Sequence, residues 1–126
     1  LHLLSRRQRQ MCIRDRRITD ASGVSKNNLI SADFISEYLV KNKDNKVLEH
    51  LPSPGEGTLT HRMLPIKNNL KAKTGTHGDA SSLAGFLTTK SGNKYAFCII
   101  INDTTSSIAD MKTLEDYLIR EAYLRL

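Results

Sequence analysis

Residues 70–88 read LKAKTGTHGDASSLAGFLT, and this stretch decides the fold. Residues 70–76 have the extended character of a strand, and residues 83–89 predict a second one. A third strand is predicted over residues 94–102, which are rich in aromatic and β-branched side chains. Between the last two, residues 90–93 read KSGN, which is typical of a tight hairpin turn. The pattern therefore predicts three antiparallel strands.

Helices are predicted on both sides of this strand region. Ser31 is a good N-cap for a helix over residues 32–41, and short helical segments are expected over residues 46–51 and 58–64. The chain closes with an amphipathic helix that begins after Ser107. Its apolar face is predicted to contain Ile108, Met111, Leu114, Leu118, Ala122 and Leu126. We therefore expect an α+β fold, an antiparallel sheet covered by helices.

The N-terminal segment has a different character. Residues 6–15, RRQRQMCIRD, resemble the in-frame translation of a transposase-type sequencing-library adapter. We therefore interpret residues 1–16 as a non-native segment and exclude them from fold reasoning. Residues 17–126 are then the C-terminal part of a domain whose N-terminal portion is missing. The alternative is a natural basic arm that binds nucleic acid or a membrane surface.

The net charge depends on this segment. The whole chain has 19 Lys and Arg against 13 Asp and Glu, a formal net charge of +6. Residues 1–16 contribute five arginines and one aspartate, so the remainder has 14 basic and 12 acidic side chains, a net charge of +2. We therefore expect no nucleic-acid partner. The sequence also has no apolar run long enough to span a membrane.

Lysine, threonine and glycine in residues 73–76 are the first candidate binding residues. Lys73 places a compact cation on a strand edge, where it could hold an acidic substrate terminus. The hydroxyls of Thr74 and Thr76 could bind a carboxylate. Gly75 would let a substrate backbone approach the strand and pair with it. Its structural alternative is a bulge glycine, and that of Lys73 is an ordinary exposed strand lysine.

A second candidate group lies upstream. Ser25 and Asn27 form a Ser-x-Asn triplet in a glycine-containing loop that opens onto a helix. Turn and helix-entry hydrogen bonding is the alternative reading, and we assign it to Ser22, Asn28 and Ser31. No cluster of Cys, His and carboxylates has metal-ligand spacing, so we expect no metal and no cofactor. Other titratable residues are interpreted structurally: His61 and His77 as surface or loop residues, and Cys98 as a small buried hydrophobe.

Several motifs in order resemble a low-molecular-mass penicillin-binding protein of the D-alanyl-D-alanine carboxypeptidase/endopeptidase type, serine peptidase family S13. The resemblance is carried by DASGVSKNNL at residues 20–29, the connection from Leu51 to Arg62, KAKTGT at 71–76, SLAGF at 82–86 and SG at 91–92. Two departures are Ala21, where the family usually has Gly, and the pair Asp79-Ala80. Neither is a motif residue.

The resemblance implies a partial penicillin-binding transpeptidase/β-lactamase-like domain. It implies hydrolysis of peptidoglycan peptides through an acyl-enzyme, β-lactams as covalent inhibitors of the full-length protein, and a periplasmic or secreted location. It also implies roles for individual groups. Ser25 would relay a proton, Asn27 would bind a substrate amide, Lys73 would be catalytic, and the Thr76 N–H would be one of two oxyanion-hole donors.

The family's nucleophile is absent from this sequence. The family acylates a serine that is followed three residues later by a lysine, and that motif lies well upstream. The formal Ser-x-x-Lys match begins at Ser91, in the predicted hairpin turn, where no base or shielded site is expected. We therefore predict that this chain alone is inactive. The alternatives are a β-lactamase or esterase of the same superfamily, or a non-catalytic cell-wall-binding homologue.

Overall fold

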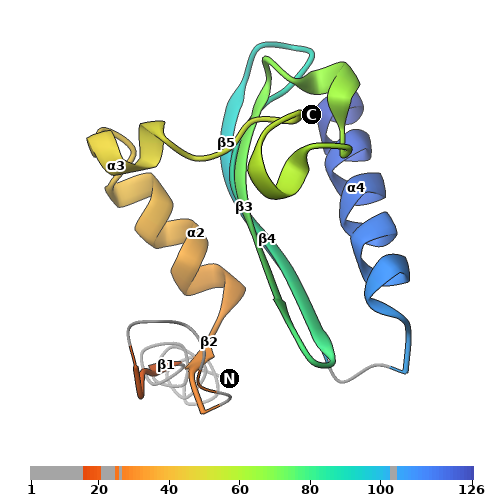
Figure 1. The fold of residues 1–126 in the computed structure, drawn as a ribbon. Coiled ribbons are helices and arrows are strands. Elements are labelled where there is room, and N and C mark those ends of the chain that lie inside the picture. Colours follow the sequence, from red (N-terminus) through yellow and green to blue (C-terminus); the bar gives the residue numbers. More distant parts are fainter. Residues whose placement is uncertain (1–15, 21–24, 26, 103–104) are drawn as a thin grey trace, which may run out of the picture.

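The computed structural model describes residues 16–20, 25, 27–102 and 105–126. Its elements are β1 (Arg16–Arg17), β2 (Leu29–Ile30), α2 (Ala32–Lys41), α3 (Lys46–Glu49), the 3₁₀ turns η1 (Gly57–Leu59) and η2 (Leu64–Ile66), β3 (Leu70–His77), β4 (Ala80–Thr88), β5 (Lys94–Ile101) and α4 (Ile108–Arg125). Figure 1 shows α2 and α4 on opposite sides of the sheet formed by β3, β4 and β5. The predicted α+β architecture is confirmed.

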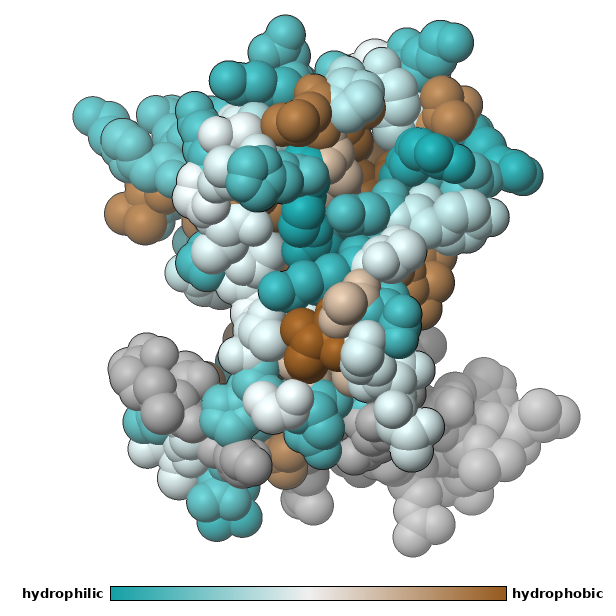
Figure 2. Space-filling model, turned by 45° about the vertical axis from the view of Figure 1, so that its right-hand side comes forward, coloured by the Kyte–Doolittle hydropathy of each residue, from teal (hydrophilic) through white to brown (hydrophobic). Residues whose placement is uncertain are grey.

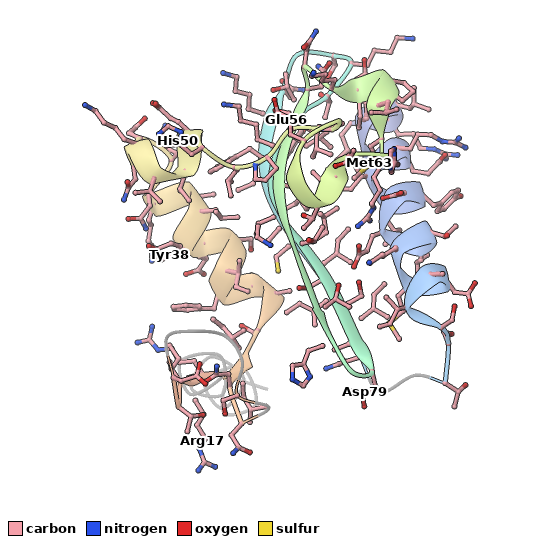
Figure 3. The ribbon with its side chains drawn as sticks, in the orientation of Figure 1. Arg17, Tyr38, His50, Glu56, Met63 and Asp79 are labelled. Carbon is pink, nitrogen blue, oxygen red and sulfur yellow. The ribbon has the colours of Figure 1, made fainter. Side chains whose placement is uncertain are left out.

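The sheet has the order β3-β4-β5, and both pairs are antiparallel. The three predicted strands are confirmed, but β4 begins at Ala80 rather than at residue 83. Ser81 and Ser82 belong to the strand and pair with Thr76 and Gly75. The hairpin between β3 and β4 is therefore tight, and Asp79 marks its tip (Figure 3).

The two faces of the sheet are covered differently. Cross-strand partners share a face, so the pairs Lys73–Ala84 and Ala84–Cys98 place these three residues on one side. This is the side of α2, which packs mainly on β5. The opposite face carries the core together with α4 and the connection from η1 to η2. Its fully or largely buried members are Leu59, Ile66, Leu70, Ala72, Leu83, Leu87 and Ile119. Burial of each large side chain stabilises the fold by about 1.5–3 kcal/mol.

The predicted helix starts are confirmed. The Ser31 hydroxyl accepts a hydrogen bond from the Phe34 N–H at 3.1 Å, and the Ser107 hydroxyl accepts one from the Asp110 N–H at 3.1 Å. The single helix predicted over residues 58–64 is wrong. Two 3₁₀ turns form instead, because Met63 has a left-handed φ of 53°, which a continuous α-helix cannot contain.

The predicted apolar face of the last helix is also partly wrong. The buried stripe of α4 is Met111, Glu115 and Ile119, whereas Leu114 is 46% exposed and Leu118 is 42% exposed. A glutamate reads as a surface residue in a hydrophobicity pattern. Here Glu115 is fully buried because the Ser81 hydroxyl and Arg62 Nη2 both donate hydrogen bonds to its carboxylate, at 2.7 and 2.8 Å. The helix is therefore rotated from the predicted orientation.

Exposed apolar side chains are spread over the surface. In Figure 2 they form separate brown patches between hydrophilic side chains. Within the part of the chain that the structure describes, no helix is both long enough and apolar enough to cross a membrane.

Gly85 packs directly against the backbone of β3 and gives a first prediction. A β-carbon at this position would overlap the carbonyl oxygen of Lys71 and lie 2.6 Å from the Ala72 Cα. Backbone atoms on the partner strand cannot rotate away. We therefore expect Gly85→Ala to lower the free energy of unfolding by about 1–3 kcal/mol, as overpacking commonly does. Denaturant unfolding of the full-length protein that contains this chain would measure the loss.

Gly75 is the matched control on the neighbouring strand. A β-carbon there would meet only the side chain of Ser82, whose Oγ lies 2.5 Å away and can move to another rotamer. Gly75→Ala should therefore cost clearly less stability than Gly85→Ala. An equal or larger loss at Gly75 would contradict this account of the sheet.

Candidate functional site

The outer edge of β3 is the centre of the candidate site. The Asn69 carbonyl accepts a hydrogen bond from the Thr88 N–H at 2.7 Å, so Asn69 is turned toward β4. The Ala72 N–H instead donates to the Pro52 carbonyl at 2.9 Å, on the opposite edge. Backbone direction alternates along a strand. Thr74 and Thr76 therefore point their N–H and C=O groups out of the sheet, at the edge beyond the Pro52 contact.

Lys73 places its ammonium group at this edge. The side chain is exposed and lies on the α2 face, and its Nζ donates a hydrogen bond to the Thr74 carbonyl at 2.7 Å. Lys71 lies on the same face two residues earlier, but its Nζ donates to the Glu49 carbonyl at 2.9 Å. The two lysines thus have different surroundings: Lys71 ties β3 to the end of α3, and Lys73 stays at the strand edge.

The threonine hydroxyls lie on the other face of the strand. Thr74 and Thr76 alternate with Lys73, so their side chains point toward the α4 face. The Thr74 hydroxyl donates to the Thr58 hydroxyl at 2.7 Å, which connects β3 to η1. Thr76 is exposed near the end of the strand. The structure therefore brings the four residues of the Lys-Thr-Gly-Thr motif together on one strand, with its cation and its hydroxyls on opposite faces.

Gly75 is not a bulge residue. Pairing runs without interruption from Leu70–Leu87 to His77–Ala80, and Gly75 is paired with Ser82. The structural alternative for this glycine is therefore wrong. The absence of a side chain at Gly75 leaves space that the Ser82 hydroxyl partly fills, since its Oγ lies 3.5 Å from the Gly75 carbonyl.

The Ser-x-Asn loop precedes β2 and α2. Ser25 is half-buried, its N–H donates to Asp20 Oδ2 at 2.9 Å, and its hydroxyl accepts a hydrogen bond from the Asn27 N–H at 3.2 Å. These bonds are local, and no hydrogen bond or ion pair joins Ser25 or Asn27 to β3 in the described part of the chain. Residues 21–24 and Lys26 lie outside the described residues.

The two motifs lie at the same end of the molecule. The loop leads into α2, which covers the sheet face that carries Lys73. In Figure 1 the β1–β2 hairpin and the tip of the β3–β4 hairpin both occupy the lower end of the view. β3 thus carries the Lys73 cation and outward-pointing N–H groups, and the Ser-x-Asn loop carries the Ser25 hydroxyl and the Asn27 amide.

The sequence did not indicate two groups of interacting residues, one in the Ser25 loop and one in the core beneath α4. Asn28 was assigned an ordinary turn role, but its side chain links Thr19 and Asp20 and closes the Ser25 loop. An Asp and an Asn at the two ends of a short glycine-containing loop were the available signal. The second group is Arg62, Glu115 and Ser81, which meet from three separate elements. No spacing in the sequence indicates that contact.

The remaining candidates are structural. Ser91 lies in the turn between β4 and β5, as predicted. Its hydroxyl donates a hydrogen bond to the Leu126 carbonyl at 2.8 Å. Burial raises the pKa of the Cys98 thiol from 9.0 to about 11, so it is protonated at neutral pH. His77 is an exposed residue at the end of β3, in agreement with the predicted surface position. Among the described residues, no group of three or more His, Cys, Asp or Glu side chains could hold a metal ion.

Comparison with known proteins gives consistent matches. The model of the D-Ala-D-Ala carboxypeptidase 3 (S13) family matches residues 6–121. The chain is 34% identical over 105 residues to D-alanyl-D-alanine carboxypeptidase DacB of Haemophilus influenzae. A crystal structure of penicillin binding protein 4 (dacB) from that organism has a TM-score of 0.72 at 30% identity, over 93% of this chain and 30% of that one. A second, complexed with a novel β-lactam, has the same TM-score at 31% identity, over 95% and 32%.

The match covers only part of the relatives. It takes in 76% of this chain but 22% of the DacB sequence. The family match also includes residues 6–15, of which the structure describes none. Of residues 1–16 only Arg16 is described, paired with Ile30 in the β1–β2 hairpin. The foreign origin of this segment, and the domain boundary after residue 16, stay predictions.

Proposed function

Because the chain belongs to the D-Ala-D-Ala carboxypeptidase 3 (S13) family, we propose that it forms one wall of the active site of a serine-type peptidase acting on peptidoglycan peptides. The observation that carries this proposal is the outer edge of β3, which no other strand of the described residues pairs with. It combines the Lys73 ammonium with outward-pointing N–H groups at Thr74 and Thr76. The substrate class is the D-Ala-D-Ala peptide terminus, and β-lactams are the corresponding inhibitors.

The geometry suggests how the peptide terminus binds. A peptide that adds to β3 as an extra strand pairs with the backbone groups of Thr74 and Thr76, beyond the position that Pro52 occupies at Ala72. Its carboxylate is attracted by Lys73, whose ammonium leaves the Thr74 carbonyl to meet it. The scissile carbonyl then lies near the end of the strand, where the Thr76 N–H donates to the developing oxyanion.

The Ser-x-Asn loop supplies the second wall. Ser25 relays a proton to the leaving amine and from the attacking water, and Asn27 donates to the substrate amide. The nucleophile is a serine outside this sequence, in the Ser-x-x-Lys motif of the full-length protein. The family match favours this peptidase over a β-lactamase or esterase. A periplasmic or secreted location follows from the same proposal, because peptidoglycan lies outside the cytoplasmic membrane.

Acylation by a labelled penicillin tests the proposal. The full-length protein should form one covalent adduct per molecule, and the 126-residue chain alone should form none, because it lacks the nucleophile. Intact-mass spectrometry followed by peptide mapping would locate the adduct. A stoichiometric adduct at Ser25 or Ser91 would require a different mechanism. A full-length protein that never acylates would support the non-catalytic, cell-wall-binding alternative.

A further inference from the structure

A set of hydrogen bonds joins the two ends of the Ser25 loop. Asn28 Oδ1 accepts from the N–H groups of Thr19 and Asp20, at 2.7 and 3.2 Å, and from the Thr19 hydroxyl at 3.2 Å. Asn28 Nδ2 donates to Asp20 Oδ1 at 3.1 Å. The two backbone donors establish which end of the Asn28 amide is the oxygen, so its nitrogen must face the carboxylate.

The same carboxylate holds Ser25. Asp20 Oδ2 accepts the Ser25 N–H at 2.9 Å, and the Ser25 carbonyl accepts the Asn28 N–H at 3.2 Å. Both backbone groups of Ser25 are therefore bound within the loop, and one of them is bound to a charged acceptor, which is the stronger kind of hydrogen bond. Asp20, Ser25 and Asn28 are all half-buried, so water competes less for these bonds than at a fully exposed loop.

We propose that Asp20 is a positioning residue for Ser25, and that Asn28 orients the Asp20 carboxylate for this role. The Ser25 N–H is held by the Asp20 carboxylate and the Ser25 carbonyl by the Asn28 N–H, so these contacts set the position of the serine. The inference rests on the proposed function, because it assumes that Ser25 takes part in proton transfer. Asp20 itself acts through Ser25 and touches no reacting atom.

Asp20→Asn is the first variant of the test. The new amide can present its oxygen to the Ser25 N–H only by turning its nitrogen toward Asn28 Nδ2, which places two donors face to face. Ser25 should therefore shift. Misplacement by about 1 Å can cost about 10²-fold in rate, so we expect kcat for a D-Ala-D-Ala peptide to fall by roughly 10- to 100-fold in the full-length protein. KM and the melting temperature should change little.

The rescue variant combines Asp20→Asn with Asn28→Asp. The new carboxylate at position 28 can accept from Thr19 and from the new amide at position 20, whose oxygen then accepts the Ser25 N–H. The hydrogen bonds among Thr19, position 20, Ser25 and position 28 are restored with the charge moved. We expect this variant to recover at least 10-fold of the lost kcat. Failure to recover, at an unchanged melting temperature, would overturn the positioning role.

Ser25→Ala separates this inference from the proposed function. In the Ser25→Ala background, Asp20→Asn should have no further effect on kcat, because Asp20 acts only through Ser25. A further loss of the same size as in the wild-type background would overturn the inference and leave the proposed function intact. If Ser25→Ala itself keeps full activity, the assumed role of Ser25 fails, and with it the premise of the inference.

Discussion

Lys73→Ala is expected to lower kcat/KM for D-Ala-D-Ala peptides by roughly 10²–10³, and to slow acylation by penicillin to a similar extent. Charge that is already in place at a reacting centre is commonly worth this much, about 3–4 kcal/mol. The Lys73 ammonium lies at the free edge of β3, 2.7 Å from the Thr74 carbonyl. Its removal takes away the cation that attracts the substrate carboxylate.

Lys71→Ala is the matched control for this prediction. Lys71 has the same charge and lies on the same face of β3, but its ammonium is bound to the Glu49 carbonyl, at the end of α3. Its loss should change kcat/KM much less and could lower the melting temperature slightly. Steady-state kinetics and thermal unfolding of both variants would separate a role in the site from a role in the scaffold. Small and equal losses of kcat/KM would mean that the Lys-Thr-Gly match is a coincidence of strand composition.

The sequence predicted the strands and helix starts well because these depend on local signals. A hydroxyl at Ser31 or Ser107 needs only the next few residues to act as a cap. The Lys-Thr-Gly-Thr motif was similarly local, because four consecutive strand residues must lie together. What it could not predict was the orientation of each group, such as the contact of the Thr74 hydroxyl with Thr58.

Contacts between distant residues explain what was missed. The burial of Glu115 depends on Ser81 and Arg62, which lie 34 and 53 positions away in the sequence. A hydrophobicity pattern treats all three as surface residues, so it assigned Leu114 and Leu118 to the buried face instead. The role of Asn28 was missed for a related reason: a turn asparagine and the hub of a loop network have the same sequence signature.

The ion pair between Arg62 and Glu115 lies in the interior, where burial strongly affects the energetics of charged groups. Arg62 Nη2 lies 2.8 Å from Glu115 Oε2 and 2.6 Å from Asp116 Oδ1, and the Glu115 side chain has no exposed surface. Burial alone lowers the pKa of Arg62. The hydrogen bonds from Arg62 to Asp116 and Glu115, together with the charges of these carboxylates, raise it by more than burial lowers it, so the net pKa lies above the ordinary value. Arg62 is therefore charged at neutral pH.

Arg62→Met should consequently be strongly destabilising. The substitution keeps an unbranched apolar stem but leaves the Glu115 carboxylate buried, with the Ser81 hydroxyl as its remaining hydrogen-bond partner. Loss of one member of a buried pair commonly costs about 3–5 kcal/mol. Hydrogen exchange of the α4 amides in the full-length protein would report this loss as a lower free energy of opening. A free energy of opening within about 1 kcal/mol of the wild-type value, the usual limit for a surface ion pair, would show that the buried Glu115 carboxylate does not need Arg62 as a partner.

Arg125→Ala provides the matched control on the same helix. Arg125 Nε lies 2.6 Å from Glu121 Oε2, closer than Arg62 lies to Glu115, but the Arg125 side chain is 76% exposed. Water screens this pair, so its loss should cost about 0.3–0.5 kcal/mol. A triple variant, Arg62→Met with Glu115→Leu and Ser81→Ala, should regain most of the stability that Arg62→Met loses, because no charge or hydroxyl is then left buried without a partner. If the triple variant is no more stable than Arg62→Met, the loss comes from packing around Arg62 and not from the unpaired charge of Glu115.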